Sequence, residues 1–469
     1  MLISFLVFFC LFTGIGIASS FWRKSTIEDY FLASREIPAW LVALSFGATI
    51  SSGATFIGFA GLAYAKGIIA VYTVAALTIG DHIGWLIAGN KIRRKAHEKQ
   101  AHTYPSLIGK FGDQDYNIVT MIAAVLTIVF LGTYCSAQLV AGAKIGESLF
   151  NWDYTYFIII GAIVLLAYCW SGGIRASIWT DAVQAVLIFL SLLILIVAGL
   201  NKIGGLGIMW STLTTIDPKL TDPFQFKSIS VIVGWLGFGV AILGQPQLMV
   251  RHMVARSDED LKVARKIYLS WRWAVLMLAC LSGMVARVLI PSTEIFDAEL
   301  SIPLLWQDLL PPVLVGLLIA GLFSATMSTA DSLLLSASSA LTQHLIPKWR
   351  DSYLLARLGT VFVIILIVSI ALVATKGVLS LVILAWAGLG SALTPMIVVQ
   401  LLGARPSQKL VLSMMIMGFI TTFYWRFGLG LHKELLDLIP GIVVGFAIFA
   451  IGYPLERRKN LKGNLSKQP

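Results

Sequence analysis

The sequence predicts an all-α membrane protein with about 13 transmembrane helices. Hydrophobic residues make up 58% of the 469-residue chain and charged residues 13%, about half the charged fraction of soluble domains. Apolar runs of about 17–25 residues, which are long enough to cross a bilayer, recur with short polar breaks. We predict spans at 2–21, 40–63, 68–89, 117–143, 155–171, 178–200, 228–250, 267–289, 311–343, 355–375, 378–402, 409–426 and 437–454.

The first span is expected to be a retained helix, because no basic residue precedes it and Arg23 and Lys24 follow it. Basic residues also indicate the orientation. The loop at 90–102, the segment Arg251–Lys266 and the tail at 456–463 fall on one side when the spans alternate. Cytoplasmic loops carry an excess of Lys and Arg, so we expect the N-terminus outside and the C-terminus in the cytoplasm.

The formal charge of +11 is explained by basic loops beside anionic lipid, and needs no nucleic-acid partner. All four cysteines lie within predicted spans, which argues against a disulfide framework or a metal cluster: Cys10, Cys135, Cys169 and Cys280. The longer polar stretches, 90–116 and 202–227, are interpreted as ordinary loops between helices. Lipid, a small solute and ions are the expected partners, with no obligate protein partner evident.

Two predicted spans are interrupted at comparable places, by "SFGATISSG" (45–53) and by "GWLGFGVAILGQPQ" (234–247). Glycine and proline release backbone groups from the helix, and lipid tolerates this only where those groups are buried or line a cavity. Each interruption begins a group of five spans, at 40–201 and 228–402. Matching breaks in two such halves are typical of inverted-repeat transporters. The alternative is that these glycines only allow close helix packing.

We therefore predict a single transmembrane transporter domain over residues 1–469. The span at 2–21 is an extra N-terminal helix, and residues 409–455 form two C-terminal helices.

The stretch "LFSATMSTADS" (322–332) places several hydroxyls inside an apolar span. Ala325, Ser328, Thr329 and Ser332 are spaced i, i+3, i+4 and i+7, so they share one helix face. Oxygen ligands suit a hard cation, and a singly charged one that must bind and leave fits this face, as sodium would. The alternative is that these hydroxyls hydrogen-bond across helices as packing contacts.

Ionisable residues inside spans are costly and usually mark ion or proton pathways. Asp331 lies just off the hydroxyl face, and Asp181 follows a glycine turn in the span at 178–200. Asp181 could instead pair with Arg175 and be structural. Asp81 and His82, in "GDHIGW" (80–85), could bind solute, relay a proton or form a buried pair.

Three stretches carry a family resemblance: "GGIRASIWTDAVQAVLIF" (172–189), "GQPQLMVRHMVARSDEDLKVAR" (244–265) and "SATMSTADSLLLSASSALTQ" (324–343). They resemble the sodium/solute symporter family, nearest its bacterial sodium/proline branch. The resemblance covers nearly the whole chain. It implies a leucine-transporter-type 5+5 inverted repeat in a bacterial inner membrane, with alternating access driven by a sodium gradient.

The resemblance implies a family sodium site at the carbonyls of Ala48 and Ser51, at Ala325, and at the hydroxyls of Ser328 and Thr329. Some members also have a second sodium site. In this chain it would involve Asp181, Ser328 and Ser332, with Asp331 where those members often have serine.

Substrate residues depart from the proline branch. Ile50 stands where proline transporters have an aspartate, and of an aromatic pair only Phe238 remains, because Ile242 replaces the other. We expect a mostly neutral polar cavity lined by Thr49, Ser52, Thr55, Gln138, Phe238 and Gln245. Such a lining suits small zwitterions such as proline, monocarboxylates, sugars or vitamins about equally.

The function expected from these features is sodium-coupled symport of a small organic solute. Proton coupling is an alternative, because Asp81, His82 and Asp331 can titrate. A channel would need a continuous polar pore, whereas the polar residues cluster at two helix breaks. An enzyme is not indicated, since the chain contains neither an H-E-x-x-H nor a G-x-S-x-G motif.

Overall fold

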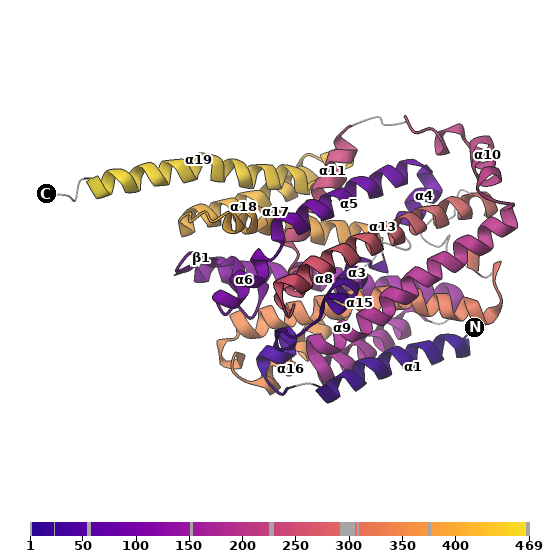
Figure 1. Ribbon diagram of the computed structural model, residues 1–469, viewed down its shortest axis with the longest axis horizontal. Coiled ribbons are helices and arrows are strands. Elements are labelled where there is room, and N and C mark those ends of the chain that lie inside the picture. The colour runs from indigo at the N-terminus through magenta and orange to yellow at the C-terminus, as the bar shows by residue number, and fades with distance from the viewer. Residues whose placement is uncertain are drawn as a thin grey trace.

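The computed structural model describes residues 2–22, 24–53, 58–150, 153–224, 229–290, 305–306, 309–373 and 377–465. Long helices run roughly along the long axis of the molecule (Figure 1). In chain order the main elements are α1 (Leu2–Ala18), α2 (Ile27–Leu32), α3 (Ala39–Ile50), α4 (Ala60–Lys66), α5 (Ile69–Ala88), α6 (Lys91–Glu98), α7 (Tyr104–Ile108), β1 (Lys110–Phe111), β2 (Gln114–Asp115), α8 (Asn117–Phe150), α9 (Tyr154–Ile203), α10 (Leu206–Ile216), α11 (Ile229–Val240), α12 (Pro246–Met253), α13 (Asp258–Leu289), α15 (Pro312–Ala340), α16 (Tyr353–Val373), α17 (Val378–Leu401), α18 (Gln408–Phe423) and α19 (Leu438–Leu465).

Within the described residues, nine helices are long and apolar enough to cross a membrane, or ten if the bent pair α11 and α12 is one span. The expected number of about 13 differs for three structural reasons. The predicted span at 2–21 is the 17-residue α1, at the lower limit of the length that crosses a bilayer. The 50-residue α9 contains both predicted spans at 155–171 and 178–200. The 12-residue α3 is too short to span alone.

Helix α9 changes direction at Gly173, where φ is +56°. A Cβ atom there would lie 2.4 Å from the Tyr30 carbonyl oxygen, so both the left-handed backbone and the close approach require glycine. This turn separates the Tyr168 half of the helix from the Asp181 half.

Both predicted helix breaks are confirmed. Helix α3 ends at Ile50, and Ser51 leaves the helical conformation with φ −91° and ψ 65°. Helix α11 ends at Val240, continues through a 3₁₀ turn at Ala241–Gly244, and restarts as α12 at Pro246 after a bend of 55°. Proline suits this restart because the first turn of a helix needs no N–H from it.

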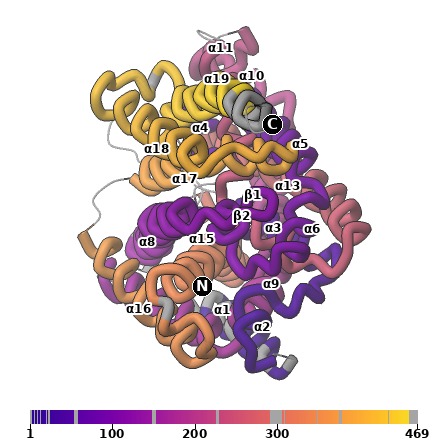
Figure 2. The backbone as a smooth tube through the Cα atoms, turned by 90° about the vertical axis from the view of Figure 1, so that its left-hand side faces the viewer, coloured from indigo at the N-terminus to yellow at the C-terminus, as the bar shows by residue number. Residues whose placement is uncertain are grey.

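Helix α15 lies in the middle of the bundle, between α8, α9 and α3 (Figure 2). It is almost entirely buried. Its run of Ala, Ser, Thr and Gly residues allows neighbouring backbones to approach closely. Helices α16, α18 and α19 lie at the periphery, and their exposed faces carry large apolar side chains such as Phe362, Ile416 and Val443.

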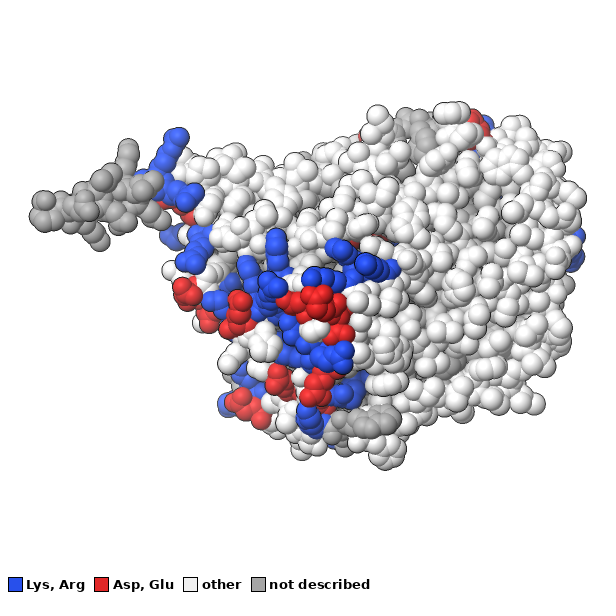
Figure 3. Space-filling view, viewed as in Figure 1, with Lys and Arg blue, Asp and Glu red and all other residues white. Residues whose placement is uncertain are grey.

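Charged side chains gather at one end of the molecule, around α6 and the start of α13, whereas the broad surface beside it is almost free of charge (Figure 3). Helix α19 reaches beyond this charged end, and the N-terminus lies at the opposite end (Figure 1). The polar stretches expected to be plain loops are partly ordered. Residues 90–116 contain α6, α7 and the β1–β2 hairpin, and residues 202–227 contain α10.

Candidate functional site

A set of oxygen atoms converges where the end of α3 meets the middle of α15. Ser328 Oγ lies 3.2 Å from both the Ala48 and Ala325 carbonyl oxygens. Thr329 Oγ1 lies 2.9 Å from the Thr49 carbonyl oxygen and 3.2 Å from that of Ala325. We call these five residues the oxygen cage. All five are buried, and the carbonyls of Ala48 and Thr49 belong to the last turn of α3 before the break.

Four of the five predicted sodium-site residues are members of the oxygen cage, and the Thr49 carbonyl was not predicted. Ser51 is the exception. It is buried next to the cage, but its hydroxyl accepts a hydrogen bond from Arg272 Nη1 at 3.3 Å. The cage contains only neutral oxygen atoms, a donor set that suits a hard, singly charged cation.

Arg251, in the last turn of α12, is fully buried beside the oxygen cage. Its Nη2 donates to Asp181 Oδ2 at 3.1 Å and its Nη1 to the Gln247 carbonyl at 2.7 Å. Further partners are Ser45, Ser177 and Ser332. The guanidinium therefore connects both broken helices to α9 and α15.

Asp331 is bound by neutral donors. Its Oδ1 accepts from Ser177 at 2.8 Å and Ser332 at 2.9 Å, and its Oδ2 accepts from the Tyr168 hydroxyl at 3.1 Å. Ser177 and Ser332 also contact Arg251. Of the second predicted cation set, Asp181 and Ser332 contact a guanidinium that was not predicted there. Asp331 is linked to it through Ser177 and Ser332, while Ser328 faces the oxygen cage.

The suggested pairing of Asp181 with Arg175 is wrong. Arg175 Nη2 instead donates to Asp29 Oδ1 at 2.6 Å and to the Ala33 carbonyl at 3.0 Å. The positive φ of Gly173 directs the following turn toward α2, which holds Asp29. Asp181 lies two turns farther along α9 and faces α12.

A small cavity lies beside the two helix breaks, and part of it is open to solvent. Helices α5, α8, α11, α13 and α17 contribute to its walls. The lining residues are Ile50, Ser52, Phe59, Leu77, Tyr134, Trp235, Phe238, Arg272, Leu379, Val382, Ile383 and Trp386. We call this space the break cavity. Phe238 stacks on Trp386 with ring centroids 4.7 Å apart.

Arg272 is the one charged lining residue of the break cavity among the described residues. It is 3% exposed, and its Nε donates to Asp81 Oδ2 at 3.1 Å. The Tyr268 hydroxyl contacts the same Asp81 oxygen at 3.3 Å. Asp81 therefore forms a buried pair that joins α5 and α13, which agrees with one of the three hypotheses for this residue. Its partner is Arg272 and not His82, which is exposed.

The predicted solute residues separate into three groups. Ser52 and Phe238 line the break cavity. Thr49, Gln138 and Gln245 make other contacts: Thr49 Oγ1 with Ser332 at 3.1 Å, Gln138 Oε1 with the Gly53 N–H at 3.0 Å, and Gln245 Nε2 with the Trp386 carbonyl at 3.3 Å. Thr55 lies outside the described residues.

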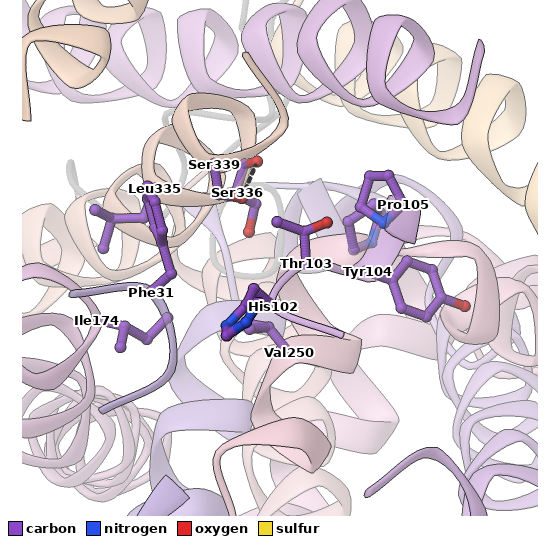
Figure 4. Close-up of a pocket in the computed structure, with 11 residues that line it drawn as sticks. Phe31, His102, Thr103, Tyr104, Pro105, Ile174, Val250, Leu335, Ser336 and Ser339 are labelled. Carbon is purple, nitrogen blue, oxygen red and sulfur yellow. Dashed lines mark hydrogen bonds between the residues drawn. The ribbon is translucent and has the colours of Figure 1, made fainter. Parts of the chain in front are cut away.

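A second small cavity lies between α15 and the segment that leads into α7 (Figure 4). Leu335, Ser336 and Ser339 of α15 form one side, and His102–Pro105 lie across from them. We call it the end cavity. Burial lowers the pKa of His102 below its usual range. Ser336 and Ser339 continue the α15 hydroxyl face that begins at Ser328.

Residues 30–418 match the family model for the sodium:solute symporter family. The chain belongs to this family. The Escherichia coli sodium/proline symporter is 31% identical over 477 residues, covering 96% of this chain and 93% of that one. The osmoregulated proline transporter OpuE of Bacillus subtilis is 28% identical over 436 residues, covering 91% of this chain and 89% of the relative.

Solved structures give the same assignment of fold. A substrate-bound, outward-open Na⁺-coupled sialic acid symporter superimposes with a TM-score of 0.82 at 18% identity, covering 96% of this chain and 95% of that one. The nucleobase-cation-symport-1 family transporter Mhp1 follows with a TM-score of 0.62 at 13% identity, covering 91% and 94%. The expected leucine-transporter-type fold is confirmed. This sodium:solute symporter is a multi-pass membrane transporter that couples solute import to sodium, and not an enzyme.

Proposed function

We propose that the coupling sodium ion binds in the oxygen cage formed by Ala48, Thr49, Ala325, Ser328 and Thr329, with the Ser51 carbonyl beside it. The observation that carries this proposal is the meeting of two hydroxyls with the carbonyls of a broken helix. Broken helices supply such carbonyls near the midplane of transporters. The site forms only while α3 and α15 touch, so binding of sodium favours that arrangement.

The solute binds in the break cavity, where Ser52 and Phe238 come from the two broken helices. The relatives are named as proline transporters, which supports an amino acid such as proline. The mostly neutral lining of the break cavity is also compatible with a monocarboxylate, a sugar or a vitamin. Sodium binding and solute binding are coupled because the oxygen cage and the wall of the break cavity share one short segment of the chain. Ser52 lies three residues after Thr49, so a solute that orders this short non-helical segment also orders the carbonyls of the oxygen cage.

One sodium ion moves per cycle. A second site would need Asp181, Asp331 and Ser332, together with Ser328, to surround another cation, but the Arg251 guanidinium already supplies positive charge at Asp181 and Ser332. Two buried carboxylates near one another need such compensation. An internal cation on α12 provides it without consuming an ion from solution.

The charged end faces the cytoplasm of a bacterial cell, and the N-terminus lies outside. Support comes from the gathering of Lys and Arg at one end of the molecule (Figure 3). The groups at 40–201 and 228–402 are the two repeats of a single domain.

The test is sodium-dependent solute uptake into proteoliposomes by Ser328→Ala and Thr329→Ala. Each change removes one ligand, so the sodium concentration for half-maximal uptake should rise about tenfold, which corresponds to about 1.4 kcal/mol. Folded protein should be nearly unaffected, because interhelical hydrogen bonds in membranes average about 0.6 kcal/mol. Ser369→Ala, whose hydroxyl bonds within its own helix α16, is the matched control.

An unchanged sodium dependence in both variants would return these hydroxyls to a packing role. Proton coupling is distinguished by imposing proton and sodium gradients separately on the native protein. Uptake driven by the proton gradient alone would contradict the proposal.

A further inference from the structure

The buried pair Arg272–Asp81 differs from a purely structural ion pair because one side of it is open. Arg272 Nε and Nη1 bind Asp81 and Ser51. Its Nη2 makes no hydrogen bond within the described part of the chain, and the residue lines the break cavity. A buried guanidinium normally has its donors satisfied. An unused donor at a cavity wall indicates a ligand that completes the set.

The remaining wall of the break cavity limits the ligand's chemistry. Ser52 and Tyr134 add two hydroxyls, and no Asp or Glu lies among the described lining residues. The other nine residues are aliphatic or aromatic. A planar guanidinium is the preferred partner of a carboxylate. The wall therefore matches a compact apolar molecule with one carboxylate, and offers a sugar few partners for its hydroxyls.

We propose that Arg272 binds the carboxylate of the transported solute, and that Asp81 and Tyr268 hold the guanidinium in place. The solute is thus an organic acid with an apolar body, either a monocarboxylate or an amino acid. This inference rests on the proposed solute site and names its substrate class. Asp81 is a positioning residue, since its contacts run to Arg272 and Tyr268 and it does not line the break cavity.

The same arginine connects the solute to sodium binding. Its Nη1 donates to the Ser51 hydroxyl, which lies between Thr49 of the oxygen cage and Ser52 of the cavity wall. A carboxylate on Nη2 fixes the guanidinium and, through Ser51, the non-helical segment. Sodium affinity should therefore rise when a carboxylate is present, and the reverse must also hold.

The first experiment uses proteoliposomes with a sodium gradient. It measures how strongly each acid and its primary amide inhibit the uptake of the other. The probes are butyrate with butyramide, and proline with prolinamide. Each acid that binds should compete about 100-fold better than its amide, because the amide lacks the charge that the guanidinium recognises. A preference for proline over butyrate identifies an amino acid, and the reverse identifies a monocarboxylate. Sodium-driven uptake of sugars or amides as good as that of acids would overturn the inference.

The second experiment removes the pair without leaving a lone charge, in the double variant Arg272→Gln with Asp81→Asn. Uptake of the acid should fall about 100-fold, while sodium binding to the purified variant, measured by tryptophan fluorescence without solute, should change less than about threefold. Arg265→Gln on the same helix, outside the break cavity, is the control. Acid uptake with an unchanged KM in the double variant would refute the role of Arg272.

Failure of the proposed sodium-coupled function would give other results than failure of the carboxylate proposal. The native protein would then show no sodium dependence for any solute, or Ser328→Ala and Thr329→Ala would leave the sodium dependence intact. Sodium-driven uptake of neutral solutes alone would instead keep the oxygen cage and reject the carboxylate.

Discussion

Two buried arginine–aspartate pairs lie on either side of the first helix break, and their surroundings differ. Arg251 is bound on all three nitrogens, to Asp181, to the Gln247 carbonyl and to serine hydroxyls from three helices. Arg272 binds Asp81 and Ser51 through Nε and Nη1, and it lines the break cavity. The first pair is closed and the second is open.

The difference indicates that the closed pair stabilises helix packing, whereas the open pair can bind a ligand. A closed pair stabilises one arrangement of helices, and it must break or move as a unit when those helices part. An open pair keeps its arginine oriented while leaving a donor for a ligand, which is the form of preorganisation that favours specific recognition. Arg251 contacts Ser45 within the broken helix α3, and Arg272 contacts Ser51 just after its end. A movement of this part of α3 would therefore change the contacts of both pairs.

The largest expected effect is that of Arg251→Gln. The change leaves Asp181 as an uncompensated buried charge, and breaking such a pair costs about 3–5 kcal/mol. We expect a large loss of folded protein in the membrane and a lower melting temperature in detergent, measured by fluorescence-detected size exclusion after heating. Arg265→Gln, on partly exposed surface of α13, should stay within about 0.5 kcal/mol of the native protein. A melting temperature of Arg251→Gln equal to that of the native protein would show that the closed pair does not stabilise the fold.

Neutral double variants sharpen the comparison. Changing both partners of a buried ion pair together avoids the lone buried charge that a single change leaves behind, so Arg272→Gln with Asp81→Asn should retain nearly native stability. Arg251→Gln with Asp181→Asn should still lose about 1–3 kcal/mol, because the Gln247 carbonyl and the serines lose their donor. Unfolding in mixed micelles measures both. Equal costs would erase the distinction between a closed and an open pair.

The fold was largely predictable, because apolar runs of sufficient length have few alternatives in a bilayer. The interruptions near Ser51 and at Ala241–Gly244 were also predictable from Gly and Pro in apolar context. The number of spans was less so, since a single left-handed glycine at 173 turns α9 without a polar loop. The short helices α6, α7 and α10 were missed because they are too short to cross a bilayer and lie in stretches that were interpreted as loops between spans.

The two arginines show where sequence reasoning about the site ended. Arg251 follows a predicted span, so it was counted among basic loop residues that indicate orientation, yet the structure buries it completely. Arg272 sits inside an apolar span, and the cost of burying its charge was a signal that could have identified it. Neither partner could be predicted, because Asp81 and Arg272 are 191 residues apart and meet only through helix packing.

The smallest predicted effect concerns His102, a titratable group outside both pairs. Its pKa lies below the ordinary value of 6.5, chiefly because it is buried, with Arg35, Lys110 and Arg350 acting in the same direction and Glu28 opposing them. The unfolded chain therefore binds a proton more readily than the folded one, and stability falls as pH drops through 6.5 toward the lower folded pKa. His102→Gln should remove this part of the pH dependence of the melting temperature between about pH 7.5 and about pH 5.5. An identical slope in the variant would mean that His102 does not titrate in this range. If the melting temperature of His102→Gln depends less on pH, the pH dependence of solute uptake can then be measured in the same variant. A remaining pH dependence of uptake points to the intramembrane carboxylates near the two pairs. Its absence favours coupling by sodium alone.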